Sequence, residues 1–227
     1  MHSTEPHTEA ARSRVTHVDF VTASEKRRLR ELGRIRRAEV DPQQRRANDL
    51  ARMRHLLAEV PRDAVIATYL SIGEEPATLE LVAVLWRRGH RILAPRLTTT
   101  DCRRLGPEPA WGWYGGPSQL RPGFLDIPEP VGERLPAATL GQADVVIVSG
   151  VAGGRDGSRI GSGAGWFDRA LSDARGDAQI WLLLNDDELF DSLPQEGHDR
   201  LVDAVISESG VTLVGAGQAH TASRPAR

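Results

Sequence analysis

Residues 150–169 read GVAGGRDGSRIGSGAGWFDR, a run crowded with glycine and closed by an aromatic pair and an acid. The apolar run just before it, residues 143–148, predicts a buried strand, and residues 166–174 predict a helix. A glycine-rich loop between a strand and a helix can present backbone N–H groups to an anion. Glycine permits this because no side chain holds the backbone away from the anion. We therefore expect a phosphate-binding loop, to which Arg155 and Arg159 could add hydrogen bonds. A merely tight strand–helix connection is the alternative.

Composition narrows the class of protein. The chain has 227 residues, 40% hydrophobic and 26% charged, which is typical of a soluble globular protein. A net charge of -2 gives no reason to expect nucleic acid or a membrane as partner. Cys102 is the sole cysteine, which excludes an internal disulfide and fits a reducing cytoplasm. No apolar run approaches the roughly 20 residues that cross a bilayer. We expect a cytoplasmic monomer that acts on small molecules.

The two ends of the chain predict little regular structure. Residues 1–22 are polar without periodicity and are expected to be a flexible extension, and residues 216–227 a flexible tail. Between them, Ser24 is a candidate N-cap for a charged helix from Lys26 to Glu39, with a narrow apolar face of Leu29, Leu32 and Ile35. Asp41-Pro42 ends that helix and starts a second one, about residues 43–57.

Apolar runs alternate with helical patterns along the rest of the chain. Strands are predicted at residues 65–70, 91–94, 145–148, 180–184, 203–207 and 211–214, with a helix at 78–88 closed by Gly89. This order predicts a Rossmann-like single α/β domain over residues 23–215, with a three-layer, mostly parallel sheet and helices on both faces. Residues 97–136 are expected to form short strands and loops that cover a site. Ligands bind at the carboxyl ends of such strands, where residues 71–76 and the glycine loop both lie.

Four motifs in order resemble one known family. They are KRRLR at residues 26–30, YLSIGEEPAT at 69–78, DIPEP at 126–130, and the glycine loop. Taken together over about residues 24–210, they are similar to the 5-formyltetrahydrofolate cyclo-ligase family, also called 5,10-methenyltetrahydrofolate synthetases. Lys26 is also the single lysine of the chain, every other cation being arginine. The resemblance would explain why a lysine is kept at that position.

The resemblance implies an activity. Members convert 5-formyltetrahydrofolate to 5,10-methenyltetrahydrofolate, using ATP as co-substrate and Mg²⁺, and release ADP and phosphate. Phosphorylation of the formyl oxygen makes it a good leaving group, and N10 of the folate then closes the ring. Such an enzyme must mainly position two ligands and neutralise the charge of the transferred phosphoryl group.

The resemblance also implies roles for individual residues. Lys26 and Arg159 would be catalytic. The nucleotide would be bound by two segments: Lys26, Arg27, Arg28, Leu29 and Arg30; and Arg159, Ile160, Gly161, Ser162, Gly163, Ala164, Gly165, Trp166 and Phe167. The folate would be bound by Leu70, Glu75 and Trp166. The metal would be held by Asp168 and Asp199, whose hard oxygens suit Mg²⁺. Several have a structural alternative: Lys26 as a solvated lysine, Glu75 as an exposed acid, Trp166 and Phe167 as packed rings, Asp168 as a helix cap, and Asp199 as a turn residue or N-cap.

The glycine loop departs from the family pattern at several positions. Gly153 replaces a bulky apolar residue and Gly154 an acid, Ser162 stands where an arginine or aromatic is frequent, and Trp166 and Phe167 replace tyrosines. Asp156 lies two residues beyond the missing acid and could compensate for it. The alternative to a working ligase is therefore a paralogue that binds a nucleotide or folate without catalysis, and a third reading is another phosphate-handling enzyme on the same scaffold.

Overall fold

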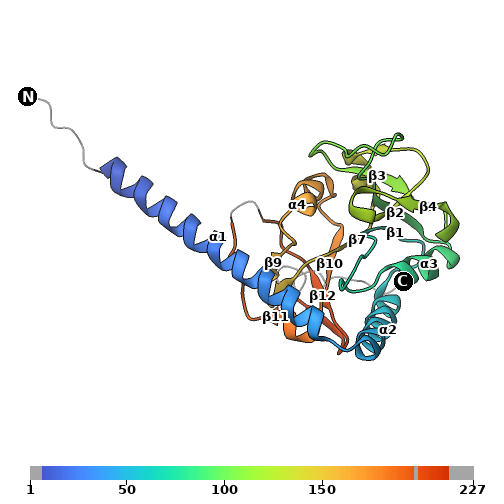
Figure 1. Cartoon of the computed structure of the whole chain (residues 1–227), viewed down its shortest axis with the longest axis horizontal. Coiled ribbons are helices and arrows are strands. Elements are labelled where there is room, and N and C mark those ends of the chain that lie inside the picture. Colours follow the sequence, from blue (N-terminus) through green and yellow to red (C-terminus); the bar gives the residue numbers. More distant parts are fainter. Residues whose placement is uncertain (1–6, 197–198, 215–227) are drawn as a thin grey trace, which may run out of the picture.

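The computed structural model describes residues 7–196 and 199–214, with side chains from Thr22 onward, and is an α/β fold around a large twisted sheet (Figure 1). The predicted tail 216–227 lies outside the described residues, as do residues 1–6 of the predicted extension. The eight strands of the main sheet run in the order β13-β12-β10-β7-β1-β2-β3-β6. Their bounds are β1 Val65–Thr68, β2 Arg91–Pro95, β3 Ala110–Trp113, β6 Leu135–Pro136, β7 Val145–Val148, β10 Gln179–Leu183, β12 Ala204–Ile206 and β13 Val211–Leu213.

The sheet is mixed, so the prediction of a mostly parallel sheet is only partly matched. The central strands β12, β10, β7, β1 and β2 are parallel, whereas β13, β3 and β6 pair antiparallel at the two edges. The central strands are nearly continuous apolar runs, as strands covered on both faces must be. β13 follows β12 after the short turn 207–210, which permits antiparallel pairing alone, whereas β3 and β6 are reached by the longer connections 96–109 and 114–134.

Strand order reverses at the centre of the sheet. From β1 the chain passes through α3 (Leu79–Arg87) to β2 on one side, whereas β7 pairs with the other side of β1 and leads on to β10 and β12. Right-handed crossovers in opposite directions place α3 and the later α4 (Trp166–Ala170) on opposite faces. The carboxyl ends of β1 and β7 are therefore the place where a crevice for a ligand is expected.

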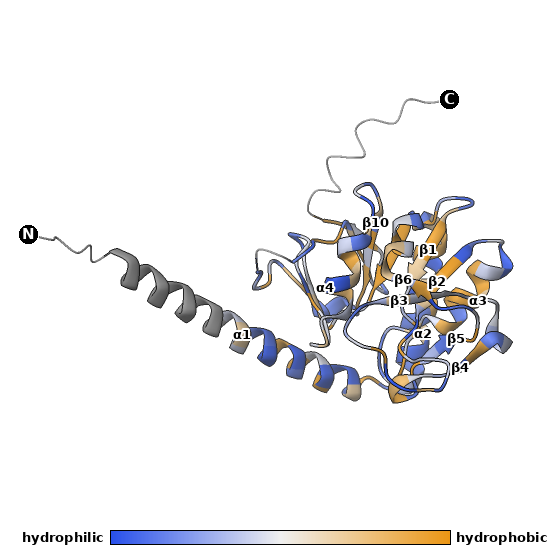
Figure 2. Ribbon diagram, turned by 90° about the horizontal axis from the view of Figure 1, so that it is seen from above, coloured by the Kyte–Doolittle hydropathy of each residue, from blue (hydrophilic) through white to orange (hydrophobic). Residues whose placement is uncertain are grey.

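The ribbon of the main-sheet strands is mostly hydrophobic, as the buried core requires, whereas the coloured part of α1 is mostly hydrophilic (Figure 2). No helix of the described residues is long and apolar enough to span a membrane. Helix α2 (Pro42–Glu59) begins as predicted: Asp41 caps it by accepting hydrogen bonds from the N–H groups of Gln43 and Gln44, at 2.9 and 3.3 Å.

Helix α1 (His7–Glu39) differs from its prediction in two ways. It begins at His7, so Ser24 is not its N-cap and residues 7–22 of the predicted extension are helical. No glycine or proline follows Pro6 before Gly33, so nothing in the sequence stops the helix there. The packed face is also different: Ile35 is 47% exposed, and the buried residues are Lys26, Gly33 and Arg37. A Cβ at Gly33 would lie 2.9 Å from the carbonyl oxygen of Val151, so glycine lets α1 approach that backbone.

The predicted phosphate loop is partly strand. Residues 152–160 form a hairpin of β8 (Ala152–Gly154) and β9 (Arg159–Ile160), which β11 (Leu189–Phe190) joins to make a small second sheet. The irregular glycine loop is therefore residues 161–165. Gly163 and Gly165 there have φ of 108° and 62°, a left-handed conformation that favours glycine. Helix α4 follows at once and is shorter than predicted, continuing as the 3-10 turn η4 (Leu171–Asp173).

Residues 97–136 form short elements beside the carboxyl ends of β1 and β2, as expected. These elements are η1 (Pro117–Gln119), β4 (Leu120–Pro122), η2 (Phe124–Asp126) and β5 (Pro128–Pro130), with β4 and β5 paired antiparallel. Two further 3-10 turns are η3 (Ala137–Gln142), before β7, and η5 (Asp186–Glu188), before β11. Leu125 and Asp126 both have positive φ, 56° and 59°, which is a strained conformation for side chains other than glycine.

Candidate active site

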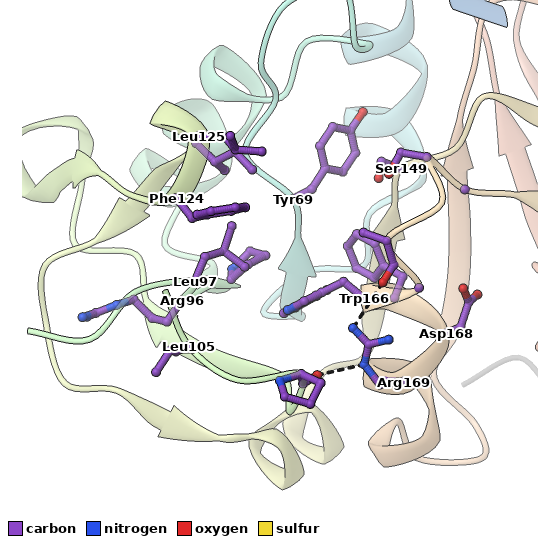
Figure 3. Close-up of a pocket in the computed structure, with 18 of the residues that line it drawn as sticks. Tyr69, Arg96, Leu97, Leu105, Phe124, Leu125, Ser149, Trp166, Asp168 and Arg169 are labelled. Atoms are coloured by element: carbon purple, nitrogen blue, oxygen red, sulfur yellow. Dashed lines mark hydrogen bonds between the residues drawn. The ribbon is translucent and has the colours of Figure 1, made fainter. Parts of the chain in front are cut away.

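A cavity of about 360 Å³ opens at the carboxyl ends of β1, β2 and β7, where the strand order reverses. Figure 3 shows Phe124 and Leu125 on one side of it and Trp166 and Ser149 on the other, with Tyr69 between them. Its volume lies in the range of about 300–1,000 Å³ for small-molecule sites. The cavity therefore has room for one flat, drug-sized ligand between an apolar wall and the glycine loop.

The loop after β1 brings an acid to this cavity. The half-buried Glu75 accepts a hydrogen bond from the N–H of Ile72 at 3.0 Å. Burial raises the pKa of Glu75, and the Ile72 hydrogen bond and the charge of Arg37 only partly oppose that rise. Tyr69 is buried below it and donates to the carbonyl of Pro76 at 2.7 Å, which fixes the loop. A half-buried carboxylate at a cavity wall is suited to accept hydrogen bonds from a ligand's N–H groups.

Arg159 lies at the start of the glycine loop and lines the same cavity. Its guanidinium donates to the carboxylate of Asp168 on α4, and its side chain is 4% exposed. Within the described residues its Nε has no hydrogen-bond partner. A buried donor without a partner is rare in folded proteins and is commonly satisfied by a ligand or water. Trp166 closes the wall, packed edge-on against Trp111 and Phe167.

Lys26 lies on α1, outside the residues that line the cavity. Its ammonium donates to Glu196 at 3.1 Å and to Asp199 at 3.0 Å, and its side chain is 11% exposed. Burial alone would lower the pKa of Lys26, but the hydrogen bonds and charges of Asp199 and Glu196 outweigh it and raise the pKa. The ammonium is therefore held charged, in a fixed place, by the segment that follows β11.

The other predicted residues of α1 divide into two groups. Arg30 donates from Nε to the carbonyl of Gly161 at 3.0 Å, so it holds the start of the glycine loop. Leu29 packs against the small cluster around Val151 and Ile160. Arg27 and Arg28 are exposed. The α1 face that meets the glycine loop is thus cationic, although its pattern in the sequence is that of a solvated helix.

The structure brings together most of the predicted site residues at the cavity. These are Leu70, Glu75, Arg159, Gly161, Ser162, Ala164, Gly165, Trp166, Phe167 and Asp168. Lys26, Arg27, Arg28, Leu29, Arg30, Ile160, Gly163 and Asp199 do not line it. Arg30 and Gly163 nonetheless lie against each other, since a Cβ at Gly163 would be 3.5 Å from Arg30 Nε.

The two carboxylates predicted for Mg²⁺ bind different cations, Asp168 to Arg159 and Asp199 to Lys26. Among the described residues, no three histidine, cysteine or acidic side chains gather as metal ligands. Mg²⁺ usually takes only one or two protein carboxylates beside substrate phosphates. Asp168 fits that role because it lines the cavity and its side chain is 36% exposed. Asp199 would have to leave Lys26 to join it.

Sequence reasoning missed a buried ion pair that anchors α1 beside the site. Arg37 donates to both carboxylate oxygens of Glu188, and its Nη2 also donates to the carbonyl of Gly150 at 2.7 Å. Both side chains are almost fully buried, at 7% and 1% exposure. Only the i, i+7, i+11 spacing of Lys26, Gly33 and Arg37 in the sequence could have indicated this face.

A second buried carboxylate, Glu129 of the DIPEP motif, supports the opposite wall. It accepts hydrogen bonds from the backbone N–H groups of Leu97 and Thr98 at 2.8 and 3.0 Å, and from Arg121 Nε at 3.0 Å. Arg96 lies 3.6 Å from it, and burial lowers the pKa of Arg96. Because Glu129 is fully buried, these partners fix the segments that carry Leu97 and Phe124.

Comparisons with known proteins agree with one another. A model of the 5-formyltetrahydrofolate cyclo-ligase family matches residues 22–208. The 5-formyltetrahydrofolate cyclo-ligase of Mycolicibacterium smegmatis is 36% identical over 63% of this chain and 72% of that protein. The corresponding protein of Escherichia coli K12 is 31% identical over 64% of this chain and 79% of its own length.

Solved structures show the same fold. The 5,10-methenyltetrahydrofolate synthetase of Aquifex aeolicus superposes with a TM-score of 0.70 at 24% identity, covering 89% of this chain and 96% of that one. The synthetase of Mycoplasma pneumoniae has a TM-score of 0.62 at 18% identity, covering 81% and 99%. At these identities the likeness concerns the fold alone.

Proposed function

The chain belongs to the 5-formyltetrahydrofolate cyclo-ligase family, a family of ATP-dependent ligases, and we propose that it converts 5-formyltetrahydrofolate to 5,10-methenyltetrahydrofolate with release of ADP and phosphate. The observation that carries the proposal is the cavity at the strand reversal, where Glu75 and Trp166 share a wall with Arg159 and the glycine loop. We place the enzyme in the cytoplasm, as a monomer acting on small molecules.

The pterin would occupy the cavity. Glu75 would accept hydrogen bonds from the pterin N–H groups, Leu70 would pack against the ring, and Trp166 would stack on it. The raised pKa of Glu75 is consistent with a carboxylate that loses hydrogen bonds to water on folding. Hydrogen bonds from the ligand would replace them. The apolar residues Leu97, Phe124 and Leu125 would exclude water from the other side.

The triphosphate of ATP would lie along residues 161–165. The partnerless Nε of Arg159 would donate to a phosphate oxygen, and Lys26 and Arg30 would approach from α1. Arg27 and Arg28 are exposed, so we expect them to contribute less than Lys26. Mg²⁺ would be held by Asp168, and by Asp199 once that carboxylate leaves Lys26, and would neutralise phosphate charge.

In the proposed reaction the formyl oxygen attacks the γ-phosphorus and ADP leaves. N10 then attacks the activated formyl carbon and loses its proton, and phosphate departs with the C–O bond. Arg159 and Lys26 would stabilise the charge on the transferred phosphoryl group, while the cavity holds oxygen and phosphorus in line. No covalent bond to the protein is needed.

Purified protein mixed with Mg²⁺-ATP and 5-formyltetrahydrofolate tests the proposal through the absorbance of the methenyl product. We expect product formation that requires ATP and yields one phosphate per ring closed. ATP binding without turnover would instead support the non-catalytic paralogue. Two of the departures that raised this alternative, Gly153 and Gly154, lie in β8 and do not line the cavity, whereas Ser162, Trp166 and Phe167 do line it.

A further inference from the structure

Arg169, on the last turn of α4, joins two segments that line the cavity. Its Nε donates to the carbonyl of Pro107 at 2.8 Å, and its Nη2 donates to the carbonyl of Ala164 at 3.3 Å (Figure 3). Pro107 belongs to the segment that precedes β3, and Ala164 to the glycine loop itself. All three residues line the cavity. One guanidinium therefore spans segments that are 57 residues apart in sequence, the difference between 164 and 107.

Residues 106 to 108 depend on this contact. Within residues 7–196 and 199–214, residues 106 to 108 make no hydrogen bond other than the one from Arg169. The nearest backbone hydrogen bond before them runs from Leu105 to Leu97, at 2.8 Å. Gly106, Pro107 and Glu108 are exposed, so packing does not fix them either. Between the fixed neighbours Leu105 and Ala110, Arg169 thus provides the hydrogen bond that holds these three residues beside the cavity.

The glycine loop leaves space for the guanidinium of Arg169 at Gly165. A Cβ at Gly165 would lie 3.1 Å from Arg169 Nη1, and Gly165 has a φ of 62°. Helix α4 itself is anchored in the core through Phe167 and Ala170. At its other end the loop is held by Arg30 through Gly161. Ala164 and Pro107 therefore share one planar donor group, carried by a helix that is anchored in the core.

We propose that Arg169 is a positioning residue that couples the nucleotide and folate sites of the proposed ligase. The inference rests on the proposed function, in which phosphates bind the glycine loop and the pterin binds the cavity. When bound phosphates fix residues 161–165, Arg169 would in turn fix residues 106–108, which border the folate. Each substrate then binds more tightly in the presence of the other, and by linkage the two effects are equal.

Calorimetric titration with a non-hydrolysable Mg²⁺-ATP analogue, with and without saturating 5-formyltetrahydrofolate, measures this coupling. For the unaltered protein we expect the folate to tighten analogue binding about fivefold or more, a typical lower limit for coupled sites. In Arg169→Ala the tightening should disappear, while the analogue alone binds nearly as before. Arg169→Lys should not restore it, because an ammonium lacks the planar fork. The matched control is Arg175→Ala, which removes an arginine paired with Asp144 and Asp177 away from the cavity.

The outcomes separate this inference from the proposed function. Coupling retained in Arg169→Ala, or absent from an active unaltered protein, would overturn the inference and leave the ligase proposal intact. Absence of turnover in the unaltered protein would overturn the ligase proposal itself. If Arg169→Ala does not fold, as judged by circular dichroism, Arg169→Lys carries the same test. If the role of Arg169 is purely structural, Arg169→Ala would weaken the binding of each ligand alone but leave the tightening by the other ligand unchanged. That result would also overturn the inference.

Discussion

The carboxylate of Asp156 occupies the space that a side chain at residue 154 would need. A Cβ built at Gly154 would lie 2.2 Å from Asp156 Oδ1 and 2.2 Å from the hydroxyl oxygen of Ser158. Asp156 also accepts hydrogen bonds from the N–H of Ser158 at 3.0 Å and from the side chain of Gln195 at 2.9 Å. The acid missing at Gly154 is thus replaced, in space, by an acid two residues later. That Asp156 compensates for the missing acid in function stays a prediction, since Asp156 does not line the cavity.

Gly154→Asp should therefore destabilise the protein rather than improve it. The new carboxylate would overlap Asp156 and add a like charge, and overpacking of this kind costs about 1–3 kcal/mol of unfolding free energy. Urea denaturation measures the loss. Adding Asp156→Gly to Gly154→Asp should recover only part of it, because the overlap with Asp156 is removed but the hydroxyl oxygen of Ser158 still lies in the way. Gly176→Asp, at a glycine with no atom within 4 Å of its Cβ position, is the matched control. If Gly154→Asp alone is as stable as the Gly176→Asp control, the prediction is contradicted.

Lys26→Ala should impair the use of ATP selectively. The ammonium contacts both Glu196 and Asp199, and we propose that it reaches the phosphates. A charged hydrogen bond of about 1.5–3 kcal/mol predicts a rise in KM for ATP of about tenfold or more. Steady-state kinetics with each substrate varied in turn provide the measurement. Arg27→Ala, next along the same helix and exposed, is the control and should change little. Equal effects of the two substitutions would remove Lys26 from the site.

Arg37→Ala should destabilise the protein strongly. It would leave the carboxylate of Glu188 buried without its cation and the carbonyl of Gly150 without its donor, and breaking such a pair costs about 3–5 kcal/mol. Arg34→Ala, which breaks an exposed pair with Glu31 on the same helix, should cost about 0.5 kcal/mol or less. Chemical denaturation of both variants tests the contrast. Replacing Arg37 and Glu188 together by methionine and leucine should cost less than Arg37→Ala alone. If the double substitution costs more than Arg37→Ala, the ion pair itself stabilises the protein, beyond the avoidance of an unpaired buried charge.

Local signals in the sequence predicted the elements that local chemistry determines. Asp41-Pro42 gave the start of α2, and the apolar run at residues 145–148 gave β7 with the bounds observed. Gly89, predicted to close α3, has the expected positive φ of 93°. The antiparallel edges were not predictable in this way, because the strands β3 and β6 are short and their pairing depends on residues far along the chain.

The face of α1 shows why part of the site escaped prediction. Apolar periodicity indicated Leu29, Leu32 and Ile35, but the helix buries charged groups whose partners come from distant segments. Arg37 meets Glu188, 151 positions away, and Lys26 meets Asp199, 173 positions away. Only the complete fold provides the carboxylates that make burial of these cations favourable. The motif carrying Lys26 was found through a family resemblance, and hydrophobicity would not have found it.

Glu75→Gln offers a test in which stability and substrate binding change in opposite directions. Burial raises the pKa of Glu75 above its usual 4.5, so folding penalises the ionised carboxylate. The penalty is absent below the pKa of the unfolded chain, where the group is protonated in both states. It develops as pH rises from the unfolded pKa toward the higher folded pKa, because the unfolded chain ionises first, and it stays constant above the folded pKa. The glutamine variant should therefore be more stable than the unaltered protein at pH 7 and equal to it below about pH 4.

Binding should change in the other direction. An amide presents one acceptor oxygen and adds N–H donors, so it cannot replace a carboxylate that accepts from two N–H groups of a pterin. We expect KM for 5-formyltetrahydrofolate to rise about tenfold or more, with KM for ATP little changed. Thermal melts at pH 4 and pH 7 and steady-state kinetics measure the two effects. Glu74→Gln, at the exposed neighbouring acid, should alter neither. A glutamine variant that is more stable at pH 7 and retains its folate affinity would mean that Glu75 is buried for packing and does not contact the substrate.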